Sequence, residues 1–101
     1  MAGKKTLYLA MLKRYVAGQK PLGTQLREAL AAADLATAER LAHTCRGVSG
    51  NVGATLIQER AGALEQALRD GAPATLVEQH LAALEEPLAQ LMQALEEAQL
   101  A

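Results

Sequence analysis

The residues best suited to chemistry are a histidine and the arginine and glycines that follow it. His43, Arg46, Gly47 and Gly50 lie within the run HTCRGVSGNVGA. A helix turns by about 100° per residue, so a helix through this run places all four on one side. A neutral imidazole is a nucleophile near pH 7, and here a cation stands one turn away. We interpret this face as a docking surface with a reactive histidine at its centre.

The two glycines support this interpretation because they are costly in a helix. A glycine inside a helix loses roughly 1 kcal/mol relative to alanine. Packing within the chain gives no evident return, because the apolar residues of the same run lie on the opposite side. What the glycines supply is bare backbone that a second molecule can approach closely. The opposite stripe consists of Ala38, Leu41, Cys45, Val48 and Val52.

The run from Glu39 to Ala54, ERLAHTCRGVSGNVGA, resembles the signature of the histidine phosphotransfer (HPt) domains. That signature has a His, a Lys three residues on, then Gly, small residues and a closing Gly-Ala pair. The positions that fit it are His43, Arg46, Gly47, Ser49, Gly50, Gly53 and Ala54. A weaker resemblance extends from about Leu7 to Leu100. Arg46 replaces the usual Lys, Cys45 a usual Leu, and Val48 a small residue.

The resemblance implies a phosphorelay. His43 would accept a phosphoryl group from the aspartyl phosphate of a response-regulator receiver domain and pass it to another receiver. Arg46 would stabilise the phosphate. Gly47, Gly50 and Asn51 would form the receiver-docking face. Asn51, near the edge of that face, is a candidate to hydrogen-bond the imidazole or the phosphoryl group, or else only a solvated residue near a helix end. The chain would belong to, or work with, a hybrid sensor histidine kinase.

The sequence predicts a phosphoryl carrier rather than an enzyme. No glycine loop of the nucleotide-binding kind is present, so we expect neither ATP binding nor self-phosphorylation. No cofactor is expected, and Mg²⁺ is expected on the partner receiver, because no carboxylate cluster surrounds His43. The two histidines and one cysteine do not make a plausible metal site.

Two other hypotheses stay open. One is a binding-only helical module that docks a receiver or kinase without phosphotransfer, which the Arg46 substitution favours. The other is a structural or oligomerising bundle, against which the exposed glycines speak. His80 lacks comparable neighbours and is interpreted as structural or merely exposed. Cys45 is interpreted as a packed thiol. The run Gly47-Val48-Ser49-Gly50 lacks the closing glycine of a hydrolase elbow, and no strand precedes it.

Composition places the chain among small helical domains. It has 101 residues, half of them hydrophobic, with two tyrosines and no Phe or Trp. We expect a single domain over 1–101, without a membrane span or membrane contact, in the reducing cytoplasm that one cysteine suits. The half up to Arg46 has a net charge of +5 and the remainder −6. Scattered basic residues without interleaved aromatics argue against nucleic-acid binding.

Apolar spacing and helix-end signals predict five helices, at about 5–17, 21–33, 35–52, 54–69 and 73–99. Asp34 is the expected N-cap of the third, and Gly18, Gly53 and Gly71 are the expected stops. Pro87 should kink the last helix or split it after Glu86. The predicted fold is an all-α, up-down-up-down antiparallel four-helix bundle over 19–101, with an additional N-terminal helix over 1–18 across one end or along one side.

Overall fold

The computed structural model describes residues 2–98, with side chains from residue 6 onward. These residues form α1 (Ala2–Gln19), α2 (Leu22–Ala31), α3 (Leu35–Asn51), α4 (Thr55–Arg69) and α5 (Ala74–Glu97). No strand occurs in this part of the chain. The prediction of an all-α helical bundle is confirmed. None of the helices in the described range is long and apolar enough to cross a membrane.

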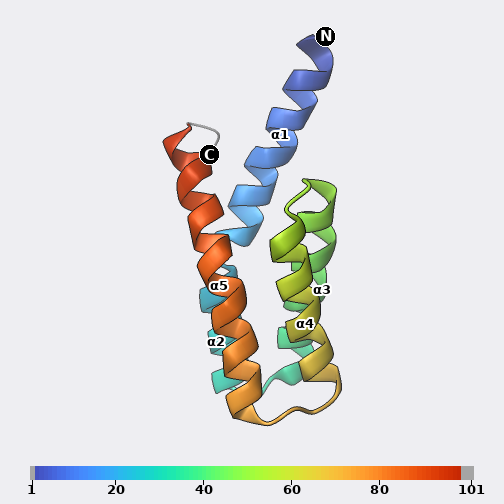
Figure 1. Ribbon diagram of the computed structural model, residues 1–101, viewed down its shortest axis with the longest axis vertical. Coiled ribbons are helices and arrows are strands. Elements are labelled where there is room, and N and C mark those ends of the chain that lie inside the picture. Colours follow the sequence, from blue (N-terminus) through green and yellow to red (C-terminus); the bar gives the residue numbers. More distant parts are fainter. Residues whose placement is uncertain (1, 99–101) are drawn as a thin grey trace.

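Figure 1 shows α2, α3, α4 and α5 running alongside one another, with the chain reversing direction at each connection. Only Lys20 and Pro21 separate α1 from α2, and α1 leads from one end of the molecule toward α2. If α1 and α2 are counted as one helix with a short break, the bundle has four members, and the other three are α3, α4 and α5. The predicted additional helix is therefore not seen as a separate element across an end or along a side.

The bounds of α3 follow from its end residues. The Asp34 carboxylate accepts hydrogen bonds from the Thr37 backbone N–H (3.1 Å) and hydroxyl (2.6 Å), which confirms the predicted N-cap. At the other end Gly53 has a φ of 79°, in the left-handed region where glycine costs least. The Ala54 N–H then reaches back to the Ser49 carbonyl at 2.8 Å. The helix that carries His43 is thus fixed at both ends.

The core explains why His43 faces outward. The side of α3 that packs inward carries small buried residues, which let α4 come close: Ala38, Ala42, Cys45 and Ser49. Leu41, Val48 and Val52 are partly buried against the same core, as the stripe predicted. Burial raises the pKa of the Cys45 thiol, which agrees with an unreactive packed side chain. Histidine 43 lies on the other side of the helix.

Several predicted boundaries were wrong. Gly18 does not stop the first helix, which continues to Gln19. The second ends at Ala31, because Ala33 takes a φ of 55° without any sequence signal for a turn. Pro87 does not split α5, which is continuous from Ala74 to Glu97, while the alternative of a kink at Pro87 stays a prediction. The predicted end of that helix at residue 99 lies outside the described residues.

Candidate functional site

The imidazole of His43 is open to solvent, with 66% of its side chain exposed. Its position on α3, away from the core, agrees with the helical periodicity of the sequence. The ring is nevertheless held in place, because Nδ1 lies 2.7 Å from Oε2 of Glu65 on α4. One ring nitrogen is thus occupied, and Nε2 is left for other chemistry.

Glu65 is a buried carboxylate at the centre of the site. Its side chain is only 2% exposed and lies in a row with Ile57 and Ala61 on the packed face of α4. Burial alone raises the pKa of Glu65. Hydrogen bonds from His43 and Arg46, together with the positive charge of Arg69, outweigh burial, so that the net pKa is lowered. Glu65 is therefore ionised at neutral pH.

The ionised carboxylate decides which ring nitrogen carries the proton. A carboxylate can only accept a hydrogen bond, so the Nδ1 of His43 must be the donor. The neutral ring then has its lone pair on Nε2. A histidine with an exposed, unprotonated Nε2 and a fixed orientation is prepared for nucleophilic attack.

Arg46 is directed toward Glu65. Its side chain passes over Gly62 of α4, where an added Cβ would lie 3.5 Å from the arginine Cδ. Its Nη1 donates to Oε1 of Glu65 at 3.2 Å. The arginine side chain thus crosses the backbone of α4 at Gly62 to reach the buried carboxylate. Arg46 and His43 share one anion, each on a different oxygen.

Arg69 completes the cluster from α4. Its Nη2 lies 3.2 Å from Oε2 of Glu65, and its Nε donates at 2.7 Å to Oε1 of Glu39. Glu39 lies one turn before His43 on α3. The arginine therefore links α3 and α4 directly beside the imidazole. A shallow pocket of about 230 Å³ next to the ring is lined by Ala36, Glu39, Arg40, His43, Glu65 and Arg69.

A model of the Hpt domain family matches residues 10–99. The chain belongs to the Hpt domain family. Such domains are phosphoryl carriers of histidine phosphotransfer in phosphorelays, act with receiver domains, and are not autonomous enzymes. No curated protein and no solved structure matches the chain.

The glycines of this Hpt domain do not share one environment. Gly47 is exposed, and a Cβ added there would meet nothing within 4 Å. Gly50 is half-buried, and its Cβ would lie 2.5 Å from Nε2 of Gln58. Gly50 is therefore not fully open to solvent, because the end of the flexible Gln58 side chain partly covers it. A docking role for either glycine stays a prediction.

Asn51 is exposed but too far along α3 to reach the imidazole. It lies eight residues after His43, which is about 12 Å along a helix axis. Glu65 holds Nδ1 instead. The expected hydrogen bond from Asn51 to the imidazole is therefore wrong. A role of Asn51 in receiver docking stays a prediction.

Sequence reasoning missed Glu65, Arg69 and Glu39. For Glu65 a signal exists, because Ala61 and Leu68, four residues before it and three after it, are apolar and share its helix face. A charge in such a row is rarely buried without a partner. Nothing comparable marks Arg69 or Glu39, which resemble ordinary surface charges.

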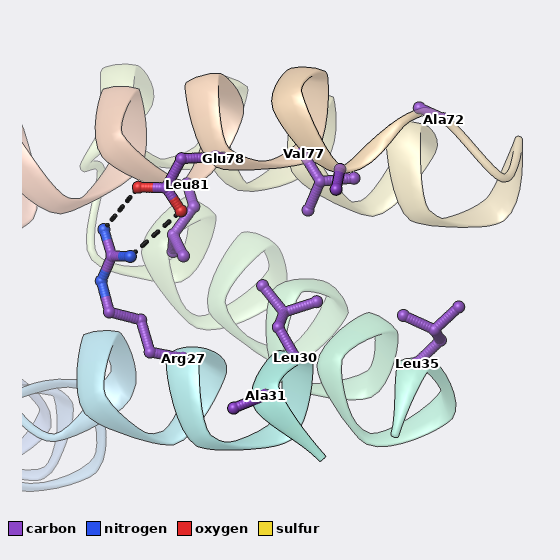
Figure 2. Close-up of a pocket in the computed structure, with 9 residues that line it drawn as sticks. Arg27, Leu30, Ala31, Leu35, Ala72, Val77, Glu78 and Leu81 are labelled. Carbon is purple, nitrogen blue, oxygen red and sulfur yellow. Dashed lines mark hydrogen bonds and ion pairs between the residues drawn. The ribbon is translucent and has the colours of Figure 1, made fainter. Parts of the chain in front are cut away.

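Other chemically capable residues of the Hpt domain lie elsewhere. Ser49 is buried, with its Oγ 2.9 Å from the Tyr15 hydroxyl, so it is no hydrolase nucleophile. His80 is half-buried on α5. Among the described residues no group of three or more His, Cys, Asp or Glu side chains could hold a metal ion. A larger pocket of about 460 Å³ lies between α2 and α5, remote from His43, and is largely apolar apart from Arg27 and Glu78 (Figure 2).

Proposed function

We propose that this Hpt domain carries a phosphoryl group on Nε2 of His43. It accepts the group from the aspartyl phosphate of one response-regulator receiver and passes it to the aspartate of another. The observation that carries the proposal is the 2.7 Å contact between Nδ1 of an exposed His43 and the buried, ionised Glu65. That contact fixes the ring and leaves Nε2 free to react.

The transfer step balances without any proton leaving the ring. The Nε2 lone pair forms a bond to phosphorus, and the bond between phosphorus and the aspartyl oxygen breaks. The electron pair of that bond returns to the aspartate as a carboxylate. The ring gains positive charge while Nδ1 keeps its proton, and Glu65 stabilises that charge. Transfer to the second receiver is the reverse reaction, and the receiver supplies the Mg²⁺.

Arg46 has to change partners during this step. In the structure it donates to Glu65, while a phosphoryl group on Nε2 would bring new anionic oxygens to the solvent side of the ring. We infer that Arg46 turns from Glu65 to these oxygens, which a guanidinium binds well. Arg69 remains on Glu65, so that the buried carboxylate keeps a cationic partner.

The remaining proposals concern the setting of the reaction. Gly47, Gly50 and Asn51 contribute to receiver docking on the His43 side of α3. Residues 1–101 act as one domain, within or beside a hybrid sensor histidine kinase in the cytoplasm. The buried, unpaired thiol of Cys45 agrees with a reducing compartment.

A second candidate is a binding-only module that docks a receiver or kinase without taking the phosphoryl group. The hydrogen bond from Arg46 to Glu65 supports it. An arginine that is bound to Glu65 is not available to bind an incoming phosphoryl group. It predicts receiver binding without any labelling of His43.

Phosphoryl transfer tests both candidates. The purified chain is mixed with receiver domains charged by a small-molecule phosphodonor and Mg²⁺, and acid-labile, base-stable phosphate on the chain is followed. We expect labelling of the wild type and of His80→Gln, and none of His43→Gln. Labelling that survives in His43→Gln would exclude His43 as the acceptor. Binding of a receiver without labelling of the wild type would favour the binding-only module.

A further inference from the structure

The pocket beside the imidazole, which we call the His43 pocket, is bordered by charged groups from two helices. Its volume of about 230 Å³ is below the range of about 300–1,000 Å³ that is usual for pockets of drug-sized ligands. A small anion such as phosphate is therefore a better match to it than a nucleotide. The lining residues come from α3 (Ala36, Glu39, Arg40 and His43) and from α4 (Glu65 and Arg69).

Three arginines lie around the two carboxylates of the His43 pocket, and one of them is unpaired. Arg46 donates to Glu65 at 3.2 Å. Arg69 lies 3.2 Å from Glu65 and donates to Glu39 at 2.7 Å. Arg40 is exposed and has no ion pair among the residues that the structure describes. Its charge is thus the one that no carboxylate beside His43 offsets.

Arg40 lies one helical turn before His43 on α3, and Arg46 lies one turn after it. Residues three apart on a helix have Cβ atoms about 5–6 Å apart, a distance that an arginine side chain can cross. The exposed imidazole therefore stands between two guanidinium groups, and only that of Arg46 is bound to a carboxylate.

A further carboxylate, that of Asp34, precedes Arg40 on the same side of the chain. Hydrogen bonds from Thr37 lower the pKa of Asp34 most, and the charge of Arg40 contributes least to that lowering. Both oxygens of Asp34 are already used in capping α3, at 3.1 and 2.6 Å from Thr37. Asp34 therefore does not hold Arg40 away from the imidazole.

We propose that Arg40 binds the oxygens of the phosphoryl group carried by His43, so that the ring and this guanidinium form an anion site for phosphate. A guanidinium binds phosphate through charge-assisted, often bidentate hydrogen bonds. Arg46 has to release a buried carboxylate before it can do so, whereas Arg40 has only to release water. Arg40 is thus the first cation to bind the group. The phosphohistidine ligand, though not the anion site, rests on the proposed function.

Inorganic phosphate tests the anion site without any transfer step. It is added to the unphosphorylated chain at constant pH and ionic strength, and the NMR signals of the His43 ring are followed. Arg40→Gln should weaken phosphate binding by about threefold or more, because an exposed charge-assisted contact is lost. Equal binding by the wild type and Arg40→Gln, or no binding by the wild type, overturns the proposal.

Arg60→Gln is the matched control for the loss of one positive charge. Arg60 is also exposed and, in the described part of the chain, without an ion pair, but it lies on α4 outside the His43 pocket. This variant should bind phosphate as the wild type does. Equal weakening by Arg60→Gln and Arg40→Gln would show only the effect of net charge and would contradict a site at Arg40. Circular dichroism checks that both variants are folded.

The lifetime of phosphorylated His43 tests the same contact on the proposed ligand. Phosphoramidate labels the chain, and loss of acid-labile phosphate is timed after the donor is removed. The half-life should shorten by about threefold or more in Arg40→Gln, with partial recovery in Arg40→Lys, which keeps the charge. Equal lifetimes in the wild type and Arg40→Gln contradict the role of Arg40 while leaving His43 as the acceptor. A wild type that takes no label contradicts the proposed function, and the phosphate titration then still decides whether Arg40 forms an anion site.

Receiver binding separates a phosphate contact from a docking contact. An exposed arginine is also able to bind an acidic group on a receiver. The affinity for an unphosphorylated receiver is therefore measured by calorimetry for the wild type and Arg40→Gln, and it should be the same for both. A loss of receiver affinity together with unchanged phosphate binding places Arg40 in the interface instead and overturns the proposal.

Discussion

Two clusters of arginine and glutamate join neighbouring helices, and they differ in which partner is buried. On α2, Arg27 stands between Glu78 and Glu85 of α5, and all three side chains are at least 30% exposed. Figure 2 shows the Arg27 pair with Glu78 at the edge of a pocket. In the other cluster the carboxylate of Glu65 is almost fully buried, while His43 and Arg46 around it are more than half exposed.

The burial of the carboxylate distinguishes a cluster that only connects two helices from one that can support chemistry at His43. In the exposed cluster the two carboxylates raise the pKa of Arg27, which is charged in any case, and solvent screens the attraction. In the buried cluster the carboxylate of Glu65 is the buried group, and the His43 and Arg46 side chains that contact it are exposed to solvent. The burial of Glu65 gives His43 a defined tautomer and an open Nε2. The two clusters should therefore respond differently to the same substitution.

The largest expected difference is in the reactivity of His43. Glu65→Gln removes the charge that orients and stabilises the ring, and labelling should slow by about 10- to 100-fold, the range found for carboxylates that orient metal-bound histidines. Glu85→Gln makes the same change in the exposed cluster and should leave the rate unchanged. Phosphoramidate, a small donor that needs no receiver, measures this rate, and ¹⁵N NMR reads the tautomer. Equal rates in both variants would remove the distinction between the clusters.

A smaller effect is expected on the lifetime of the phosphorylated form. Arg46→Gln removes the cation that should turn to the phosphoryl group, and the half-life should shorten by roughly tenfold or less. Arg46→Lys keeps the charge without the planar fork, so transfer should continue with altered rates or receiver preference. Arg27→Gln is the control in the exposed cluster. Unchanged kinetics of Arg46→Lys with every receiver would show that the arginine has no special role.

These contrasts show what the sequence can predict and what it cannot. Periodicity placed His43 outward and Cys45 inward, because both depend only on the rotation between helix residues. Asp34 and Gly53 were found as helix ends, because capping and left-handed turns are local. Glu65 was missed because its meaning depends on how α3 and α4 pack. The turn at Ala33 was missed for a related reason, since the alanines before it favour continuing the helix.

The next comparison concerns stability and its pH dependence. The folded-state pKa of Glu65 is lowered, so its contribution is complete above the ordinary carboxyl pKa and is lost as the pH falls through the lowered value. Glu65→Gln should reduce the free energy of unfolding by about 1–2 kcal/mol at pH 7, and the difference should shrink in acid. Arg27→Gln should reduce the free energy of unfolding by less, about 0.5–1 kcal/mol. Denaturant unfolding at pH 7 and in acid measures both, and a pH-independent gap would contradict the ionised Glu65.

The smallest expected effect comes from glycine, and here stability and function should move in opposite directions. Gly47→Ala adds a methyl group that meets nothing within 4 Å and should stabilise the chain by about 0.5–1 kcal/mol. Gly18→Ala is the matched control, because Gly18 is also helical and unobstructed but lies in α1. Only Gly47→Ala should weaken receiver binding, measured by calorimetry, because only its methyl group stands on the His43 side of α3. If both variants are stabilised and both bind as the wild type does, bare backbone at Gly47 is not needed for docking, and the cost of that glycine needs another explanation.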